Sequence, residues 1–269
     1  MNKYKTIALL SAISICLALG SCKGNESQAD SPDIPIPPPN SQTDTNMNYN
    51  YNTDVSAYLS AIISKNLFLV NKQNPCGESY VPANLKKLPE AIAIKDIELD
   101  ATAASALEAM MQEMRAAGIN DVFVTSAYRS FEYQTYLYNS YCEAERAQNP
   151  NLSDSEIKQK VLTYSAYPGT SEHQSGLCVD LMSTKMTKLV NYGRETDTEG
   201  DLGFAETEAY TWLMQNAYKF GFIIRYPQNK TALTGYSYES WHYRFVGREA
   251  ASSIYAQGIT LEEYLKQIQ

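Results

Sequence analysis

The stretch Ser171–Asp180, SEHQSGLCVD, joins a polar segment to the apolar run Leu177–Met182 and carries one of the two histidines in the chain. The apolar run predicts a buried strand. Because side chains alternate between the faces of a strand, Asp180 would point away from His173, seven residues earlier, if the segment were extended throughout. Gly176 can interrupt that alternation with a turn or a bulge. We therefore expect a break at Gly176 that lets both side chains converge.

The segments around this stretch mix helices and short strands without a regular alternation. Hydrophobic spacing and end signals predict helices over residues 100–117, 131–147, 153–164 and 206–220, and two short helices at the end of the chain, the last opening with the capping pair Thr260 and Glu263. Strands are expected over residues 121–125, 177–182, 222–225 and 241–246. This pattern favours an α+β fold over a doubly wound sheet. We expect a single domain with a small, mainly antiparallel sheet flanked by helices and with the functional site at the sheet.

The composition is that of an acidic globular protein. The 269 residues are 44% hydrophobic and 19% charged, which argues against disorder throughout the chain. The formal net charge of −8 argues against a nucleic-acid partner, which would need a basic surface. Tyrosine is abundant, at 21 residues, and its apolar ring with a polar tip suits sites for polar ligands. We expect a monomer that binds no nucleic acid.

The N-terminus has the pattern of an export signal. Two lysines precede an apolar run over residues 7–18, which is too short to span a membrane as a helix. The run ends in Leu19–Cys22, LGSC, which resembles the lipobox of bacterial lipoproteins. That resemblance implies a lipoprotein signal peptide over residues 1–21, acylation of Cys22, and a membrane-anchored, extracytoplasmic protein at the cell envelope. An ordinary secretory signal is the alternative.

Residues 22–55 are expected to form a lipid-anchored disordered linker. This segment is rich in Ser, Asn, Asp and Gln and contains the proline run Pro35–Pro39. Such a composition cannot bury enough apolar surface to fold, and the prolines favour an extended spacer. Residues 56–269 are expected to fold as one domain.

Three cysteines remain once Cys16 leaves with the signal and Cys22 is acylated: Cys76, Cys142 and Cys178. Outside the cytoplasm Cys76 and Cys142 could form a disulfide, but a sequence does not define the pairing. Cys178 lies in the apolar run and is expected to be a small buried side chain. The chain has no CxxC spacing, which excludes a cysteine-based zinc site.

The second histidine, His242, follows Glu239 by three residues. A catalytic zinc is typically held by three histidine or carboxylate ligands, with a fourth position open for water. His173, Asp180 and His242 could supply such a set, and Glu239 the carboxylate that accepts the proton of the water. The pair Glu239 and His242 can share one site if the chain bends at Ser240–Trp241. On composition alone, two histidines and two acids are a modest indication of a metal site.

Longer motifs around these residues resemble the VanY-type D-alanyl-D-alanine carboxypeptidase family, zinc peptidases of bacterial cell-wall metabolism. Four motifs occur in the order of the family: Ser126–Gln134, Pro168–Asp180 with the pattern SxHxxGxxxD, Phe220–Lys230, and Thr234–His242 with the pattern ExxH. The resemblance spans roughly residues 69–247. The sequence departs from the family at Cys178, where alanine is common, and at Ser240, where proline is common.

The resemblance implies one catalytic zinc ion and removal of the C-terminal D-alanine from peptidoglycan stem peptides by the domain over residues 56–269. The resemblance also implies that zinc activates a water molecule and that Arg129 meets the substrate, where its planar guanidinium would suit a terminal carboxylate. The implied residues are His173, Asp180 and His242 for the metal, Glu239 and Arg129 for catalysis, and Arg129, Gln134 and Ser171 for substrate binding.

Two other functions remain open at this point. One is an L,D-carboxypeptidase acting on tetrapeptide stems, which the residues above do not separate from D,D activity because both substrates end in a D-alanine carboxylate. The other is a zinc-containing domain that binds wall peptides without cleaving them. The presence of both Glu239 and Arg129 argues against the second, because a binding module has no need of a base.

Overall fold

The computed structural model describes residues 49–186, 190–191, 194–195 and 203–269. The predicted signal peptide, Cys22 and most of the predicted linker lie outside these residues. The domain begins earlier than the predicted residue 56: the Tyr51 hydroxyl donates to the Lys219 carbonyl at 3.0 Å, and the backbone N–H of Thr53 donates to the buried Glu113 carboxylate at 3.0 Å. Residues 49–53 therefore pack on the domain and are not part of a free spacer.

Eight α-helices lie within the described residues, together with several 3-10 turns. The helices are α1 (Leu59–Ile63), α2 (Ala101–Ala116), α3 (Phe131–Gln148), α4 (Asp154–Val161), α5 (Glu208–Asn216), α6 (Thr231–Thr234), α7 (Arg248–Gln257) and α8 (Leu261–Gln267). The 3-10 turns are η2 (Ser56–Tyr58), η3 (Glu172–Ser175), η4 (Phe204–Glu206) and η5 (Ala217–Phe220). The predicted helix over residues 206–220 is thus a shorter α5 extended by η5.

A four-stranded antiparallel sheet lies at the centre of the fold, with strand order β3-β4-β8-β7. Its strands are β3 (Val122–Ser126), β4 (Cys178–Ser183), β7 (Phe222–Tyr226) and β8 (Glu239–Phe245). Two separate two-stranded sheets join β1 (Leu85–Lys87) to β2 (Glu98–Asp100) and β5 (Val190–Asn191) to β6 (Arg194–Glu195). The expected α+β domain with a small antiparallel sheet is confirmed, whereas β1, β2, β5 and β6 were not predicted.

The hydrophobic core lies between the sheet and the helices on one of its faces. Helix α2 begins at Asp100, whose carboxylate caps the backbone N–H groups of Thr102 and Ala103, and Gly118 follows its end with a left-handed φ of 88°. Its buried side chains join alternate residues of β4 and β8 in one cluster; among the members are Leu107, Met110, Val179, Leu181, Tyr243 and Phe245. The residues between them on both strands, including Asp180 and His242, therefore face the other side of the sheet.

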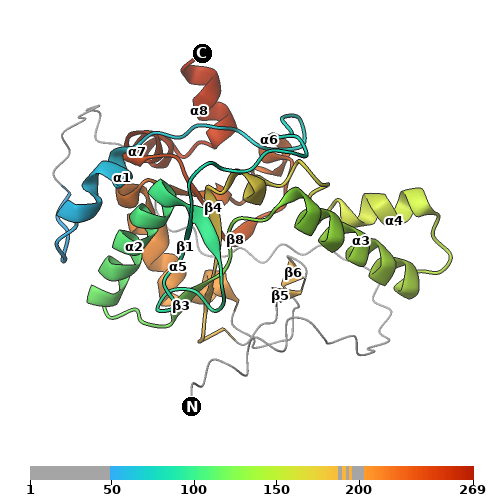
Figure 1. Ribbon diagram of the computed structural model, residues 1–269, viewed down its shortest axis with the longest axis horizontal. Helices are drawn as coiled ribbons and strands as arrows, with labels where there is room; N and C mark the ends of the chain where they lie inside the picture. Colours follow the sequence, from blue (N-terminus) through green and yellow to red (C-terminus); the bar gives the residue numbers. More distant parts are fainter. Residues whose placement is uncertain (1–48, 187–189, 192–193, 196–202) are drawn as a thin grey trace.

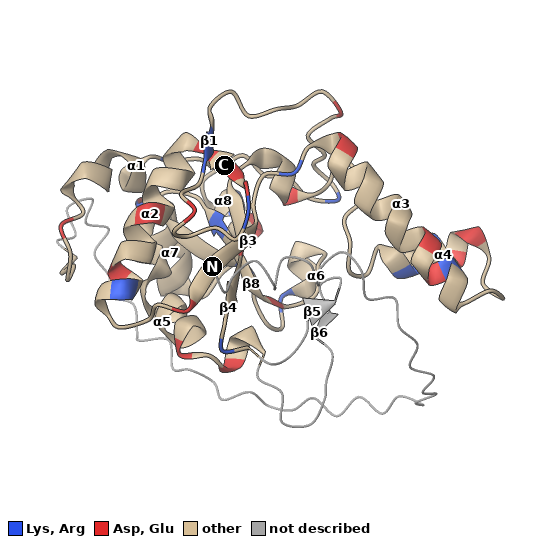
Figure 2. Cartoon of the chain, turned by 60° about the horizontal axis from the view of Figure 1, so that its bottom comes forward, with Lys and Arg blue, Asp and Glu red and all other residues tan. Residues whose placement is uncertain are grey.

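Figure 1 shows helices α2, α5 and α7 gathered at one end of the molecule and the α3–α4 pair projecting from the other. A small cluster of Tyr138, Cys142, Ile157 and Val161 joins α3 to α4. Helix α4 opens with the predicted capping box between Ser153 and Glu156, and α8 with that between Thr260 and Glu263. In the parts of the chain coloured in Figure 2, basic and acidic residues are interspersed along the helices and strands.

Cys76, Cys142 and Cys178 are all free and buried. The disulfide between Cys76 and Cys142 that the sequence left open is therefore not formed. Cys76 instead lies against the backbone carbonyl of Gly169, with Sγ 3.6 Å from the oxygen. Across the described ranges, no helix has both the length and the apolar character needed to cross a membrane.

Candidate active site

The stretch that carries His173 turns back on itself before it enters the sheet. Residues Glu172–Ser175 form the 3-10 turn η3, and Gly176 ends it in the left-handed region, at a φ of 69°. Strand β4 then begins at Cys178. The turn brings the Nε2 atom of His173 to 3.2 Å from Oδ2 of Asp180. The break predicted at Gly176 is present, and it brings the two predicted ligands together.

A bulge in β8 brings Glu239 and His242 to the same place. Ile224 pairs with Tyr243 and Tyr226 with Glu239, so a step of two residues on β7 spans four on β8. Because of the extra residues, Glu239 leaves the simple alternation and lies with its Oε2 3.3 Å from Nδ1 of His242. Asp180 pairs directly with His242, and its Oδ1 lies 3.2 Å from the same nitrogen.

The two imidazoles present different nitrogens to Asp180. The Nδ1 atom of His173 lies 2.6 Å from the backbone carbonyl of Ala127, which can only accept a hydrogen bond, so Nδ1 carries the hydrogen and Nε2 faces Asp180. In His242 the Nε2 atom lies 3.2 Å from the Glu172 carboxylate, and Nδ1 faces Asp180. Each ring thus has one nitrogen held by the protein and one lone pair directed at a common point.

The donor atoms around that point fit a zinc ion. Oδ1 of Asp180 is buried and, although it lies 3.2 Å from Nδ1 of His242, it accepts no well-aligned hydrogen bond within the described part of the chain, which is costly for a carboxylate unless a cation meets it. The two nitrogen-to-oxygen spacings of 3.2 Å are close to the separation of about 3.4 Å between ligands on a tetrahedral zinc. The two rings lie 4.9 Å apart and nearly perpendicular, at 85°. One carboxylate and two imidazoles leave a fourth position open.

Opposite charges within the cluster shift the pKa values of its members. Burial and the nearby Arg129 lower the pKa of His173, but the charges of Asp180 and Cys178, together with the hydrogen bond to Asp180, raise it overall, to about 9. Burial raises the pKa of Asp180, yet His173 and His242 hold it well below its usual range. The carboxylate is therefore ionised and ready to bind a cation, which must compete with protons for the histidines.

Cys178 adds a sulfur donor to the cluster. It lies on the same face of β4 as Asp180, two residues away, and is fully buried, as predicted. Its Sγ atom and one nitrogen of each of His173 and His242 all lie within 4.8 Å of one another. The sequence indicated only a small buried side chain at this position. Cys178 therefore lies among groups that can bind metal, and Asp180 remains the carboxylate nearest both rings.

Arg129 lies beside the cluster, and not every nitrogen of its guanidinium has a hydrogen-bond partner among the residues described. Its Nη2 atom is 3.6 Å from Oδ2 of Asp180, and its buried Nε has no hydrogen-bond partner among the residues described. Gln134 holds the group in place, because its Oε1 accepts from Arg129 Nη1 at 2.9 Å while its Nε2 donates to the Ala166 carbonyl at 2.9 Å. Ser171 lines the same cavity, whereas Gln134 is absent from its described lining. Gln134 thus holds Arg129 in place from behind the residues that line the cavity.

A network of buried ion pairs lies behind His242, and most of it was not predicted from the sequence. Glu172 is 2% exposed and accepts from Arg225 Nε and Arg244 Nη1, each at 2.8 Å. Burial would raise the pKa of Glu172, but the two guanidinium groups lower it. An arginine inside each of the apolar strands FIIRY and ESWHYRF was the available signal, because buried charges need partners.

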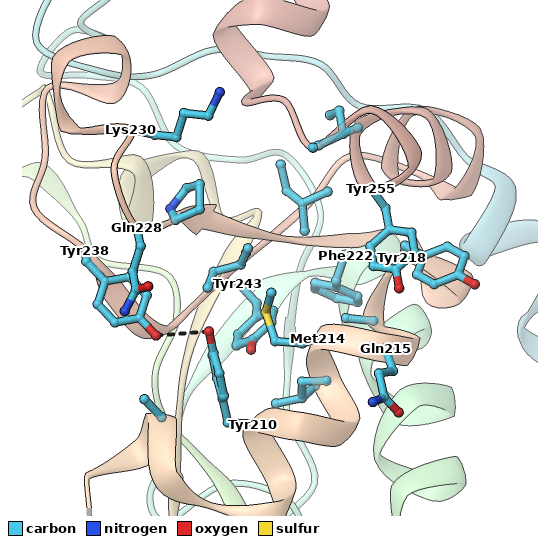
Figure 3. A pocket seen from close by; sticks show the side chains of 18 of the residues that line it. Tyr210, Met214, Gln215, Tyr218, Phe222, Gln228, Lys230, Tyr238, Tyr243 and Tyr255 are labelled. Atoms are coloured by element: carbon cyan, nitrogen blue, oxygen red, sulfur yellow. Dashed lines mark hydrogen bonds between the residues drawn. The ribbon is translucent and has the colours of Figure 1, made fainter. Parts of the chain in front are cut away.

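The cluster opens into a cavity of about 350 Å³ lined by the predicted site residues Arg129, Ser171, His173, Asp180, Glu239 and His242. A larger cavity of about 670 Å³ lies between α5, α7 and β7 and is lined mainly by apolar and tyrosine side chains (Figure 3). There the Tyr238 hydroxyl donates to the Tyr210 hydroxyl at 3.0 Å. None of the predicted site residues is among the described residues that line the larger cavity. The smaller cavity is the candidate active site.

Comparisons with known proteins agree with this geometry. The model of the family described as "VanY: D-alanyl-D-alanine carboxypeptidase" matches residues 96–248, which is more than half of the chain. A D-alanyl-D-alanine carboxypeptidase of Enterococcus faecalis is 38% identical over 200 residues, covering 74% of this chain. The chain spans just under two thirds, 65%, of the length of that relative.

Solved structures of similar proteins share the fold. VanYB in complex with D-alanine-D-alanine is 36% identical with a TM-score of 0.60, covering 76% of this chain and 98% of that one. A vancomycin-resistance D,D-pentapeptidase VanY mutant in complex with Zn(II) is 37% identical with a TM-score of 0.58, covering 74% and 98%. The LdcB LD-carboxypeptidase is 33% identical with a TM-score of 0.59, covering 75% and 86%.

The zinc-bound relative and the donor atoms of this chain point to the same cofactor. The VanY mutant was solved with Zn(II), and His173, Asp180 and His242 converge here at spacings that suit that ion. The donor set of this chain therefore fits zinc. The matched range, the four ordered motifs and the shared fold lead to one conclusion: the chain belongs to the VanY family of D-alanyl-D-alanine carboxypeptidases.

Proposed function

We propose that this protein is a zinc carboxypeptidase that removes the C-terminal D-alanine from peptidoglycan stem peptides. The observation that carries the proposal is the position of Arg129, whose guanidinium lies 3.6 Å from the carboxylate of Asp180 and lines the same cavity as the histidines. A cation next to a metal site suits a substrate that presents a free carboxylate beside its scissile bond. A peptidase for internal bonds would have no need of such a group.

The residues of the cavity have separate roles in the proposed reaction. His173, Asp180 and His242 hold the zinc ion, which when bound supplies a Lewis acid that lowers the pKa of a water molecule and polarises the scissile carbonyl. Arg129 binds the terminal carboxylate of the substrate, and Gln134 fixes the orientation of its guanidinium. Ser171 contributes to the wall of the cavity from the residue before η3.

Glu239 is the general base of the proposed reaction. Its carboxylate is part of the cavity wall, and its Oε2 lies 3.3 Å from the nitrogen of His242 that faces the metal position. From there Glu239 can accept a proton from the attacking water and pass it to the leaving amine of D-alanine. This role also separates the proposal from a domain that only binds wall peptides.

Hydrolysis of defined stem peptides tests the proposal. The purified protein with zinc should release D-alanine from a pentapeptide ending in D-alanyl-D-alanine, and should not cleave the same peptide with an amidated C-terminus. A tetrapeptide stem in the same assay distinguishes D,D from L,D activity: both stems release D-alanine, so the stem that is cleaved shows which bond the enzyme accepts. No release of D-alanine from either stem would overturn the proposed function.

We also propose that the protein acts at the cell envelope, held by acyl chains on Cys22. The support is the LGSC sequence at Leu19–Cys22 after a short apolar run, and a proline-containing segment that could reach toward the wall. A single acyl chain anchors only weakly, so stable attachment requires more than one. Mass spectrometry of the protein from membranes should find an N-terminal Cys22 carrying acyl groups, and an unmodified Cys22 would contradict the anchor.

A further inference from the structure

We propose that the C-terminal helix α8 positions the zinc ligand His242 through a relay of buried charges that runs from Glu262 to Arg225 to Glu172. Glu172 and Glu262 are positioning residues in this proposal, because neither faces the metal directly. The inference rests on the proposed ligand set and adds an element that lies outside the range matched by the family, which ends at residue 248.

The first contact of the relay fixes the imidazole of His242. Oε2 of Glu172 lies 3.2 Å from Nε2 of His242, on the side of the ring opposite Nδ1, which faces Asp180. A carboxylate at that distance accepts the Nε2 hydrogen and leaves the Nδ1 lone pair free for the metal. Glu172 is the first residue of η3 and directly precedes His173, the other histidine ligand. One short turn therefore carries the ring of His173 and the carboxylate that contacts the ring of His242.

The second contact holds Glu172 in one orientation. Its Oε1 accepts from Arg225 and from Arg244, each at 2.8 Å, while Oε2 is left for His242. Both arginines are fully buried, and Arg244 also donates to the backbone carbonyl of Phe68 at 2.7 Å. With two rigid guanidinium groups on one oxygen, the carboxylate cannot rotate away from the histidine without leaving buried charges unpaired.

The third contact connects the network to α8. Glu262, the second residue of that helix, binds Arg225 with both oxygens, at 2.9 Å and 2.5 Å, and also accepts from Asn71 at 3.3 Å. The helix is held against the domain by a separate apolar cluster that includes Leu261 and Tyr264 together with Ile223 of β7. The position of α8 therefore determines where the guanidinium of Arg225 lies, and through it the orientation of Glu172.

The test is the zinc affinity of the whole protein, measured by competition with a chelating dye. The variant Glu172→Gln should bind zinc roughly 10- to 100-fold more weakly than the wild type. Glu262→Gln should weaken binding by a smaller but measurable factor, because it loosens Arg225 without touching His242. Glu113→Gln is the matched control: this buried carboxylate accepts from the backbone N–H groups of Asn52 and Thr53, neither of which belongs to the relay, and the change should leave zinc affinity unchanged.

The outcomes separate a positioning role from a merely structural one. If Glu172→Gln or Glu262→Gln lowers thermal stability but binds zinc as tightly as the wild type, that step of the relay is wrong. A protein that binds zinc with the expected differences but releases no D-alanine would contradict the proposed function and leave this inference standing. The two failures are therefore distinguishable.

A measurement on the wild type covers the case in which a variant does not fold. The chain has only two histidines, so long-range ¹H–¹⁵N spectra of the zinc-loaded protein should show two imidazoles. His242 should carry its hydrogen on Nε2 and His173 on Nδ1, the opposite tautomers that Glu172 and the Ala127 carbonyl select. A His242 ring with its hydrogen on Nδ1 would overturn the proposal.

Discussion

The Nε2 atom of His173 lies 3.2 Å from Oδ2 of Asp180 although the two residues are seven apart in the sequence and Asp180 belongs to a regular strand. The approach depends on η3 and on the left-handed backbone of Gly176. It is reinforced by a backbone hydrogen bond from the Gly176 N–H to the His173 carbonyl at 3.2 Å. The metal site is therefore sensitive to the conformation of a residue that contributes no side chain.

The substitution Gly176→Ala should damage both the fold and the metal site. At a φ of 69° an alanine costs about 1–2 kcal/mol of stability for its backbone alone, and its Cβ would also lie 2.8 Å from Cγ of Pro82. Relief of that clash should displace the turn that carries His173. We expect a lower urea midpoint and less than one zinc per molecule.

Gly118→Ala is the control for backbone strain. Gly118 also has a left-handed φ, of 88°, but a Cβ there would meet nothing within 4 Å. This variant should lose stability through the backbone cost alone and should keep its zinc. Equal destabilisation of the two variants, or full zinc content in Gly176→Ala, would show that the contact with Pro82 has no consequence.

Much of the fold could be predicted because its local signals are strong. The apolar spacing of α2 and the capping pairs Ser153 with Glu156 and Thr260 with Glu263 placed helix ends close to where they are. Strands β1 and β2 could not be predicted in the same way, because three-residue strands such as Leu85–Lys87 are held by pairing across the fold and carry no periodic pattern.

The candidate site was predictable in its residues but not in its supports. Motif spacing pointed to His173, Asp180, Glu239 and His242, and all four line one cavity. The role of Glu172 depends on two arginines that are more than fifty residues away in the sequence, so only the folded chain shows that its charge is paired. Gln134 likewise belongs to a substrate motif, yet its orientation toward Arg129 is set by the carbonyl of Ala166.

Glu239→Gln should abolish catalysis without removing zinc. The amide is nearly the same size as the carboxylate but cannot accept the proton of the attacking water, so D-alanine release should fall by roughly 10²- to 10⁴-fold. Glu239 is not one of the proposed ligands, so the zinc content of the variant protein, measured by metal analysis, should equal that of the wild type. Loss of zinc together with activity would instead make Glu239 a ligand.

Arg129→Ala should weaken the reaction only for substrates with a free C-terminus. Charge-assisted hydrogen bonds to a carboxylate are worth about 1.5–3 kcal/mol, so kcat/KM for a stem pentapeptide should drop by roughly 10- to 150-fold. Residual cleavage of the amidated peptide, if measurable in the wild type, should not change.

The variant Gln134→Leu, which removes the partner of Arg129 but keeps the charge of Arg129, should raise KM by a smaller factor. A Gln134 variant as impaired as Arg129→Ala would mean that Gln134 itself contacts the substrate.

Zinc affinity should rise with pH until His173 has lost its proton. Without metal, Asp180 and Cys178 raise the pKa of His173 to about 9 in spite of burial and the charge of Arg129, so this imidazole is protonated at pH 7. Zinc needs the neutral ring, and each bound ion must therefore displace at least one proton at pH 7. Calorimetric titrations in buffers of different ionisation enthalpy should detect that release, and the apparent Kd should fall about tenfold per pH unit for each proton released. In Asp180→Asn the carboxylate that raises the pKa is gone, so proton release at pH 7 should decrease along with the affinity. A zinc affinity that does not change between pH 6 and pH 8 would show that His173 is already neutral in the metal-free protein.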